Sequence, residues 1–207
     1  MARNKQKRKS KKTFSIIVDG ETEVWYFQMM KKHENLPRID IKPELPKKKK
    51  LSEQFQSVIQ NSCIYDNVIW ILDFDTIIKE SAETKKGEKA TIQLFKEYLA
   101  KLKSYSNIEV LVNTPCLEFW FLLHFKETSK YFSQCESSEK ELKKDYLKKY
   151  EKTEKFFKKR DNDIYLMLKS NQKTALKNSK KLGSFNINNP KKGISEMYKV
   201  LGLLSIK

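Results

Sequence analysis

The chain has 207 residues and a formal net charge of +17, with 43 Lys and Arg against 26 Asp and Glu. This length and the 39% of hydrophobic residues predict one folded domain with a sizeable core. No apolar stretch approaches the roughly 18–20 residues that cross a bilayer, and no apolar signal segment is present, so we expect a cytoplasmic protein with no membrane partner. The charge favours nucleic acid, an anionic surface or an acidic protein as partner.

The three cysteines, Cys63, Cys116 and Cys135, lie far apart in the sequence and form no CxxC pair. This spacing is typical of proteins in a reducing cytoplasm. It argues against a zinc site and against a disulfide framework.

The N-terminal half alternates apolar strand patterns with helical patterns. Residues 1–12 are rich in Lys and Arg, which predicts a disordered basic arm, either a solvated tail or a segment that seeks phosphate. Residues 35–50 and 76–90 are polar and predict connections. The remaining patterns predict, in order, strand 13–19, helix 21–34, helix 52–62, strand 68–74, helix 91–104 and strand 108–112.

The C-terminal half is helical in pattern. Thr114 as N-cap and Pro115 at the first helical position predict a buried helix to about Phe125. The rest predicts an amphipathic basic helix over 139–160, in one piece or two, one or two helices over 163–182, a loop over 183–190 and a last helix over 191–203. This order predicts a single α/β domain over 13–207, with a parallel-sheet core flanked by helices and a helical C-terminal portion.

Acidic residues follow the two strongest strand patterns at the point where each ends. Asp19, Glu21 and Glu23 follow the first, and Asp73 and Asp75 follow the second. Because the carboxyl ends of parallel strands border one crevice, we expect these carboxylates to meet there. Asp73 and Asp75 would point to the same side of a strand and could present oxygens to one hard cation, although acids are also common at strand ends and in the first turn of a helix.

Two polar residues interrupt the apolar segment 116–125. A carboxylate such as Glu118 is costly there unless it is paired or ligates a metal. His124 lies six positions further on, about 240° around a helix, so the two should not share a face. We interpret His124 as a hydrogen-bonded core histidine.

Lysines suited to a polyanion occur in several segments. Lys173, Lys177 and Lys180 are spaced along one helix face, which is either a solvated face or one that meets developing charge on a phosphate. A second group is the run Lys47, Lys48, Lys49 and Lys50. We expect this run, the N-terminal arm and residues 139–160 to hold a nucleic-acid backbone through salt-dependent contacts.

Several segments taken together resemble one known family, the RloB-like proteins. The resemblance covers about residues 13–203, and its motifs are specific in combination rather than singly. They are Ile17-Val18-Asp19-Gly20-Glu21-Thr22-Glu23 with Tyr26-Phe27, Leu72-Asp73-Phe74-Asp75, Asn113-Thr114-Pro115-Cys116-Leu117-Glu118-Phe119-Trp120 with His124-Phe125, and Asn189-Pro190.

This resemblance implies a Toprim-like core, a relation to the overcoming-lysogenization-defect nucleases, and phosphodiester cleavage that depends on Mg²⁺ or Mn²⁺. It also implies an effector, or toxin, of antiphage or abortive-infection defence, encoded beside an ABC-type ATPase partner.

The resemblance also implies site residues. In Toprim sites a Glu-Gly pair opens the first motif and an Asp-x-Asp makes the second. Asp19 stands where that Glu is expected, Glu23 at the next acid, Asp73 and Asp75 at the Asp-x-Asp, and Glu118 in the family's Pro-x-x-Glu-x-Trp segment. Asp19 is one methylene shorter than Glu, which changes its reach by roughly 1.5 Å. Either Glu21 or Glu23 compensates for this, or the activity is weak.

Three hypotheses follow for function. The first is a metal-dependent nuclease acting on RNA, such as tRNA, or on DNA, in which Glu23, Asp73 and Asp75 hold Mg²⁺ and Asp19 completes the shell or acts as base. The second is a haloacid-dehalogenase-like phosphatase with Asp73 as nucleophile and Asp75 as acid/base, although the later acidic motif of that superfamily is missing. The third is a non-catalytic module that binds nucleic acid or a partner.

Overall fold

A computed structural model describes residues 12–34, 39–45 and 50–206 of the chain. The predicted basic arm over 1–11 and the lysines Lys47, Lys48 and Lys49 lie outside the described residues. Lys12 was predicted to belong to the arm, but it is the first residue of strand β1.

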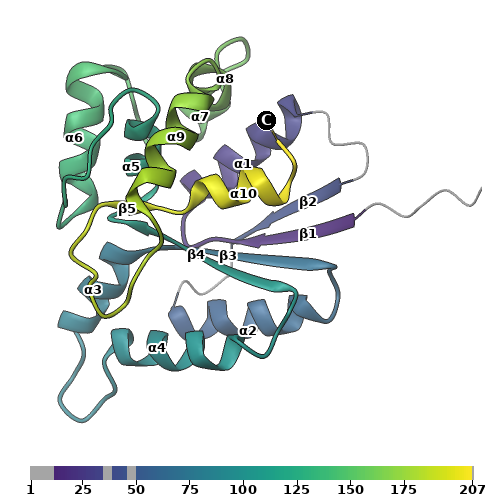
Figure 1. Cartoon of the computed structure of the whole chain (residues 1–207), viewed down its shortest axis with the longest axis vertical. Helices are drawn as coiled ribbons and strands as arrows, with labels where there is room; N and C mark the ends of the chain where they lie inside the picture. The colour runs from purple at the N-terminus through teal and green to yellow at the C-terminus, as the bar shows by residue number, and fades with distance from the viewer. Residues whose placement is uncertain (1–11, 35–38, 46–49, 207) are drawn as a thin grey trace, which may run out of the picture.

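Within the described residues the strands form one five-stranded sheet in the order β2-β1-β3-β4-β5 (Figure 1). The first four pair in parallel, and only β5 runs antiparallel, at the edge beside β4. This confirms the predicted α/β fold with a mostly parallel sheet. The strands are β1 Lys12–Ile17, β2 Ile39–Glu44, β3 Asn67–Asp73, β4 Ile108–Thr114 and β5 Ile194–Ser195.

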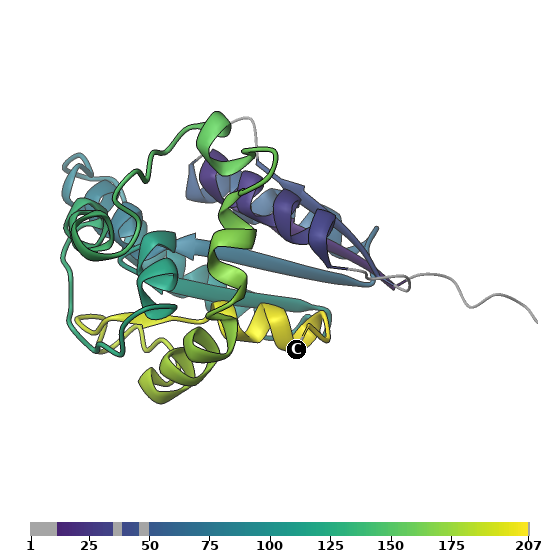
Figure 2. The same ribbon diagram turned by 90° about the horizontal axis from the view of Figure 1, so that it is seen from above.

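Helices cover both faces of the sheet (Figures 1 and 2). On one face lie α2 Leu51–Ser62, α3 Phe74–Ala82 and α4 Thr91–Leu102. On the other lie α1 Glu21–His33, α5 Leu117–Leu123, α6 Cys135–Asp145, α7 Glu154–Phe157, α8 Ile164–Lys169, α9 Gln172–Leu182 and α10 Met197–Leu203.

The central strand β3 contributes to two separate cores because successive side chains point to opposite faces. Ile69 and Ile71 are buried in the larger core beneath α1 and the C-terminal helices. Trp70 and Leu72 are buried in the smaller core beneath α2, α3 and α4. The indole Nε1 of Trp70 donates to Gln54 Oε1 at 2.8 Å, which satisfies its one polar group. A strand buried on both faces is typical of parallel sheets, and it fixes the position of the strand's carboxyl end.

Two segments predicted as connections contain regular structure. The range 35–50 includes β2, which lies at the edge of the sheet formed by the described residues and pairs with β1. It contains Pro43, a residue tolerated at a sheet edge because it has no N–H to donate to the ladder. The range 76–90 begins inside α3, which starts at Phe74, directly after β3 ends at Asp73. The prediction of a connection was therefore wrong for both ranges. The first contains the short polar edge strand β2, and the second begins within α3, whose first turn contains Asp75 of the acidic motif.

Element boundaries around β4 and β5 also differ from the prediction. Thr114 is not an N-cap but the last residue of β4, because it pairs with Ile194 of β5. The Thr114–Pro115 peptide bond is cis, and Cys116 is the N-cap of α5. The range 191–203 includes β5 before its helix begins at Met197.

Residues 139–160 form two helical pieces, the second half of α6 and the short α7, joined by the irregular segment 146–153. The range 163–182 likewise forms two helices, α8 and α9. In the described part of the chain, no helix is long and apolar enough to pass through a membrane.

Candidate metal centre

Three carboxylates meet at the carboxyl edge of the sheet. Asp19 follows β1, Asp73 ends β3, and these two strands are paired neighbours, so their ends lie side by side. Glu23 comes from the first turn of α1, which follows β1 after three intervening residues. One oxygen from each of Asp19, Glu23 and Asp73 lies within 4.8 Å of the others, a spacing at which one cation can be held. The structure thus brings together three of the residues that the sequence predicted for the site.

Glu23 is held in place by its own turn. Its side chain is 2% exposed, and Thr22 Oγ1 donates to Glu23 Oε2 at 3.0 Å. The carboxylate lies so close to Gly20 that a Cβ at that position would collide with Glu23 Oε2. Gly20 has an extended backbone with φ of −133°, so the need for glycine arises from this close approach and not from the backbone conformation.

Asp73 is oriented by the neighbouring strand β4 and by the start of α5. Asn113 Nδ2 lies 3.4 Å from Asp73 Oδ1, and the Leu117 amide donates to Asp73 Oδ2 at 3.3 Å. The Asp73 amide in turn donates to Asp19 Oδ2 at 3.4 Å, which links the two strand ends. Asn113 itself is fixed by a 2.7 Å hydrogen bond from Ser195 Oγ to its Oδ1.

Burial and mutual repulsion make this group unfavourable as three free anions. Burial, followed by the charges of Asp19 and Glu118, raises the pKa of Glu23 to about 8. Burial, followed by the charges of Asp19 and Glu23, raises the pKa of Asp73 well above its usual value. A nearby cation would reverse both effects because it stabilises the ionised forms.

Asp75 does not join this group. The strand ends at Asp73, so Asp75 lies in the first turn of α3 instead of on the same strand face. Its Oδ2 accepts a 2.9 Å hydrogen bond from the Cys135 amide at the start of α6. The expectation that Asp73 and Asp75 point to the same side as strand residues was therefore wrong, and a catalytic or metal-binding role for Asp75 stays a prediction.

Glu118 is buried and paired, as its apolar surroundings require. Its side chain is almost inaccessible, and its Oε1 accepts from Tyr150 Oη at 2.6 Å and lies 2.9 Å from Lys152 Nζ. The charge of Glu118 contributes to the raised pKa values of both Glu23 and Asp73, which places it at the margin of the same site. Its catalytic role stays a prediction.

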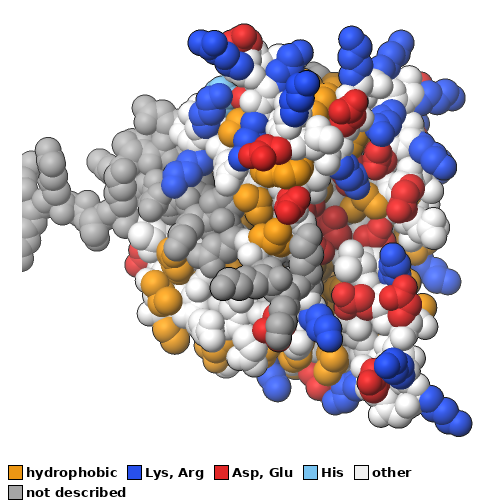
Figure 3. Space-filling view, turned by 180° about the vertical axis from the view of Figure 1, so that it is seen from behind, with side chains coloured by type: hydrophobic (Ala, Val, Ile, Leu, Met, Phe, Trp, Pro, Cys, Tyr) orange, Lys and Arg blue, Asp and Glu red, His pale blue; other side chains and the backbone are white. Residues whose placement is uncertain are grey.

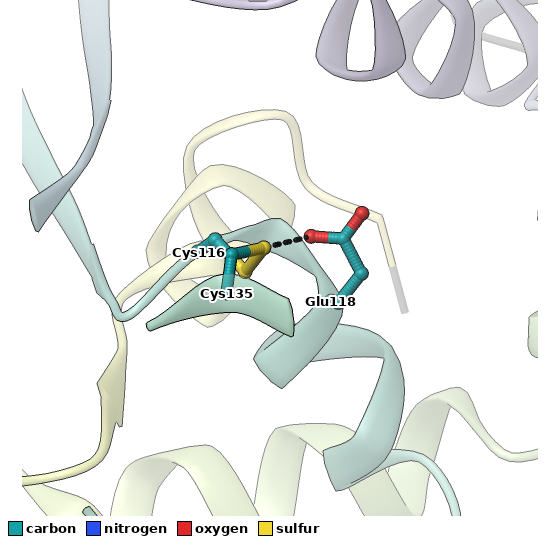
Figure 4. A group of neighbouring side chains, drawn as sticks. All are labelled: Cys116, Glu118 and Cys135. Carbon is teal, nitrogen blue, oxygen red and sulfur yellow. Dashed lines mark hydrogen bonds between the residues drawn. A yellow bond between two sulfur atoms is a disulfide. The ribbon is translucent and has the colours of Figure 1, made fainter. Parts of the chain in front are cut away.

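Cys116 and Cys135 form a disulfide next to Glu118 (Figure 4). The expectation of unpaired cysteines was wrong for these two, because the start of α5 and the start of α6 meet in space although 19 residues separate the cysteines. Cys135 Sγ lies 2.9 Å from Glu118 Oε2, but a disulfide sulfur carries no proton to donate. Neither sulfur is a thiolate in this state, so the group Cys116, Glu118 and Cys135 lacks the soft ligands that zinc prefers. Cys63 is exposed and free.

Other residues singled out in the sequence lie away from this centre. His124 is a buried core histidine, as expected: its Nδ1 lies 2.9 Å from the Trp120 carbonyl, and burial lowers its pKa to about 4. Glu21 is exposed on α1. Lys50 is exposed before α2, and Lys173, Lys177 and Lys180 are exposed on α9, so their predicted contact with nucleic acid stays a prediction.

The sequence reasoning did not single out Tyr150, Lys152 or Cys135 as site residues. Tyr150 and Lys152 lie in the irregular segment between α6 and α7, where helical periodicity carries no signal. Cys135 contacts Asp75 through its backbone amide, a group that any residue except proline would supply.

Figure 3 shows acidic side chains gathered in a hollowed band on the right of the molecule, with lysines and arginines spread around its margins.

The fold and the site define an α/β protein with a partly buried carboxylate cluster at the carboxyl edge of its sheet. The family model described as RloB-like protein matches residues 14–204, nearly the whole chain. The chain therefore belongs to the RloB-like family, as its motifs indicated. No curated protein and no solved structure matches the chain.

Proposed function

We propose that this protein is a nuclease that depends on a divalent metal ion and cleaves phosphodiester bonds, with Asp19, Glu23 and Asp73 as the metal ligands. The proposal is carried by this group itself. It consists of three carboxylates from two adjacent strand ends and the following helix, close enough to share one cation, in a chain of net charge +17. A basic protein that gathers acids in one place is suited to holding a metal against a polyanion.

The donor set fits a hard cation such as Mg²⁺ or Mn²⁺, which carboxylate oxygens prefer to bind. In the described part of the chain, neither Glu23 nor Asp73 forms an ion pair with a lysine or arginine, and the pKa of each is raised. A divalent ion at this position activates water and stabilises the charge that develops on a phosphate.

The chain's own residues supply orientation around this centre. Asn113 and the Leu117 amide hold the Asp73 carboxylate, and Thr22 holds that of Glu23. Lys152 places an ammonium beside Glu118. Burial lowers the pKa of this lysine, but the charges of Glu118, Glu139 and Asp73 together raise it above its usual value. We keep Asp75 and Glu118 as proposed site residues: Asp75 anchors the start of α6, and Glu118 anchors Tyr150 and Lys152.

We further propose that the nuclease is an effector of bacterial antiphage or abortive-infection defence and acts with an ABC-type ATPase. A Toprim-like character of the core belongs to the same proposal. The defence role and the ATPase partner are supported by family membership alone. The Toprim-like core is supported by family membership and by the mostly parallel α/β sheet.

Cleavage of nucleic acid by the purified protein tests the proposal. Total cellular RNA and plasmid DNA are incubated with wild type and with Glu23→Gln, in Mg²⁺, in Mn²⁺ and in EDTA. We expect metal-dependent cleavage of one substrate class and a loss of about 100-fold or more in the variant, comparable to removing other preorganised electrostatic groups from an active site.

The matched control is Glu97→Gln, which makes the same change of charge at an exposed residue of α4 that pairs with Lys89. It should cleave like wild type. Equal metal-dependent cleavage by wild type and Glu23→Gln would contradict the assigned site. A wild-type protein that does not cleave is tested again with the ABC-type ATPase added. If it still does not cleave but binds nucleic acid, the protein is a binding module and not a nuclease.

A further inference from the structure

A groove rich in lysine lies next to the candidate metal centre. It is formed by the turn after α6, by α7 and by the start of α8 (Figure 1), and it encloses about 480 Å³. Cavities of this size hold small-molecule ligands and single building blocks of polymers. Its basic lining residues are Lys148, Lys149, Lys155 and Lys159.

The charge of this groove is available to a ligand. Its four lysines face a single acid, Glu151, and within the described residues none of the four forms an ion pair with a carboxylate. The hollow between α2, α3 and α4 differs, because its lining combines two lysines with three acids: Lys50 and Lys89 with Glu80, Glu83 and Glu88. The groove beside α7 is therefore better suited to an anion than the hollow between α2, α3 and α4.

The rest of the groove lining is largely apolar. Phe156, Leu147 and Met167 line it and are half-buried, and the Phe156 ring packs against Tyr150 with 5.5 Å between the ring centroids. Aromatic surfaces flanked by cations are what single-stranded nucleic acids bind, because every unpaired base can stack its face on a ring while its phosphate meets a lysine. In a duplex the base faces are already stacked and cannot reach such a surface.

The groove connects to the candidate metal centre through one side chain. Tyr150 lines the groove, and its hydroxyl donates to Glu118 at the margin of the centre. Lys152, two residues further on, pairs with the same carboxylate at 2.9 Å. The segment from Leu147 to Lys152 therefore borders both the groove and the centre, and a strand bound in one lies beside the other.

We propose that this groove binds an unpaired segment of the substrate, with a base against Phe156 and phosphates on Lys155 and Lys159. The inference rests on the proposed nuclease function and assigns it a single-stranded substrate. The shared chemistry of single-stranded RNA and DNA does not separate the two, so both are used in the test.

Binding is measured by fluorescence anisotropy in EDTA, where a metal-dependent nuclease does not cleave. The probes are a 12-nucleotide oligo(U), a 12-nucleotide oligo(dT) and a 12-base-pair duplex. We expect wild type to bind a single strand at least about fivefold more tightly than the duplex, the lower end of what one base stack contributes. Phe156→Leu, which keeps an apolar side chain, should weaken single-strand binding by a similar factor.

Lys155→Gln/Lys159→Gln is the second variant, because it does not disturb the packing of Phe156. It should reduce the slope of log Kd against log salt by about 1.4, or about 0.7 for each lost phosphate contact. The matched control is Lys101→Gln/Lys103→Gln, two exposed lysines at the end of α4 with the same change of charge. Melting curves establish that every variant is folded.

The inference is overturned if the duplex binds as tightly as both single strands, or if the groove and control variants bind alike. Metal-dependent cleavage that groove variants leave unchanged would also overturn it, while the nuclease proposal would stand. A different outcome is that the groove variants lose single-strand binding while the wild type shows no cleavage. This outcome would support the groove as the binding site and refute the proposed nuclease activity.

Discussion

The close approach of Glu23 Oε2 to Gly20 fixes the position of the Glu23 carboxylate in the candidate metal centre. Gly20→Ala places a methyl group against Glu23 Oε2, closer than two such atoms can lie, so the carboxylate must shift from the position it holds beside Asp19 and Asp73. We expect metal-dependent cleavage to fall at least about tenfold, because displacements near 1 Å are costly in active sites. Cleavage rates measured over a range of Mg²⁺ concentrations check this.

Gly202→Ala is the matched control for this substitution. Gly202 lies in α10 with open space around its Cβ position, and alanine should stabilise a helix there by about 0.5–1 kcal/mol. It should leave cleavage unchanged. If Gly20→Ala cleaves as well as Gly202→Ala does, Glu23 is not held where the metal site needs it.

The raised pKa of Glu23 predicts how the stability of the metal-free protein depends on pH. The native state holds a proton on Glu23 up to a pKa of about 8, whereas the unfolded chain releases it near 4.5. Between these values the native state binds more protons, so the free energy of unfolding falls as pH rises, by up to about 1.4 kcal/mol per pH unit.

Thermal melts in EDTA at pH 5.5 and pH 8 measure this dependence. Wild type should lose more stability over this interval than Glu23→Gln, which has no proton to release. Added Mg²⁺ should raise the melting temperature of wild type more at pH 8, where binding does not have to displace the proton. Parallel pH profiles for the two proteins would show that Glu23 is not buried against other carboxylates.

Asp19, Glu23 and Asp73 could be predicted as site residues because acids that follow buried parallel strands gather at one edge of the sheet. The position of Asp75 could not, because the spacing of two residues indicates a shared face only while the strand continues, and β3 ends at Asp73. Tyr150 and Lys152 reach Glu118 from 32 and 34 residues further along the chain, and only tertiary packing reveals this.

At the scale of elements, the strongly apolar strands and the amphipathic helices were predictable, whereas β2 and α3 were not. The strand β2 contains Pro43 and is an edge strand, so alternation and β propensity are weak there. The helix α3 follows β3 without a loop, so no turn residue marks its start. The position of β5 depends on its pairing with β4, which no local pattern indicates.

The disulfide between α5 and α6 predicts a simple thiol count. Under denaturing but non-reducing conditions, one thiol, that of Cys63, should react with a thiol reagent, and three should react after reduction. Reduction should also lower the melting temperature, because closing a loop of this length stabilises a fold by about 3 kcal/mol. Cys63→Ser should show no reactive thiol before reduction. Three reactive thiols in unreduced wild type would show that the disulfide does not form.

Considered as a whole, the molecule has a sheet that separates two cores and carries a partly buried carboxylate group at its carboxyl edge. Three acids meet at this edge, in a chain of net charge +17, and the face in Figure 3 carries many lysines and arginines beside its acidic side chains. Under the proposed function, such a distribution would attract a polyanion over a distance, and a metal would bridge it to the carboxylates. The composition favoured a polyanion and the strand patterns predicted the edge, whereas no residue pattern in the sequence separates RNA from DNA as the substrate.

Mn²⁺ binding tests the central claim most directly, because it requires no knowledge of the substrate. Electron paramagnetic resonance of Mn²⁺ titrated with wild type, with Glu23→Gln and with the control Glu97→Gln measures the bound fraction at each concentration. The proposed centre predicts saturable binding to wild type and to Glu97→Gln, with binding weakened at least about tenfold in Glu23→Gln, as expected for loss of one charged ligand. Equal binding by all three proteins would show that Asp19, Glu23 and Asp73 do not form the metal site.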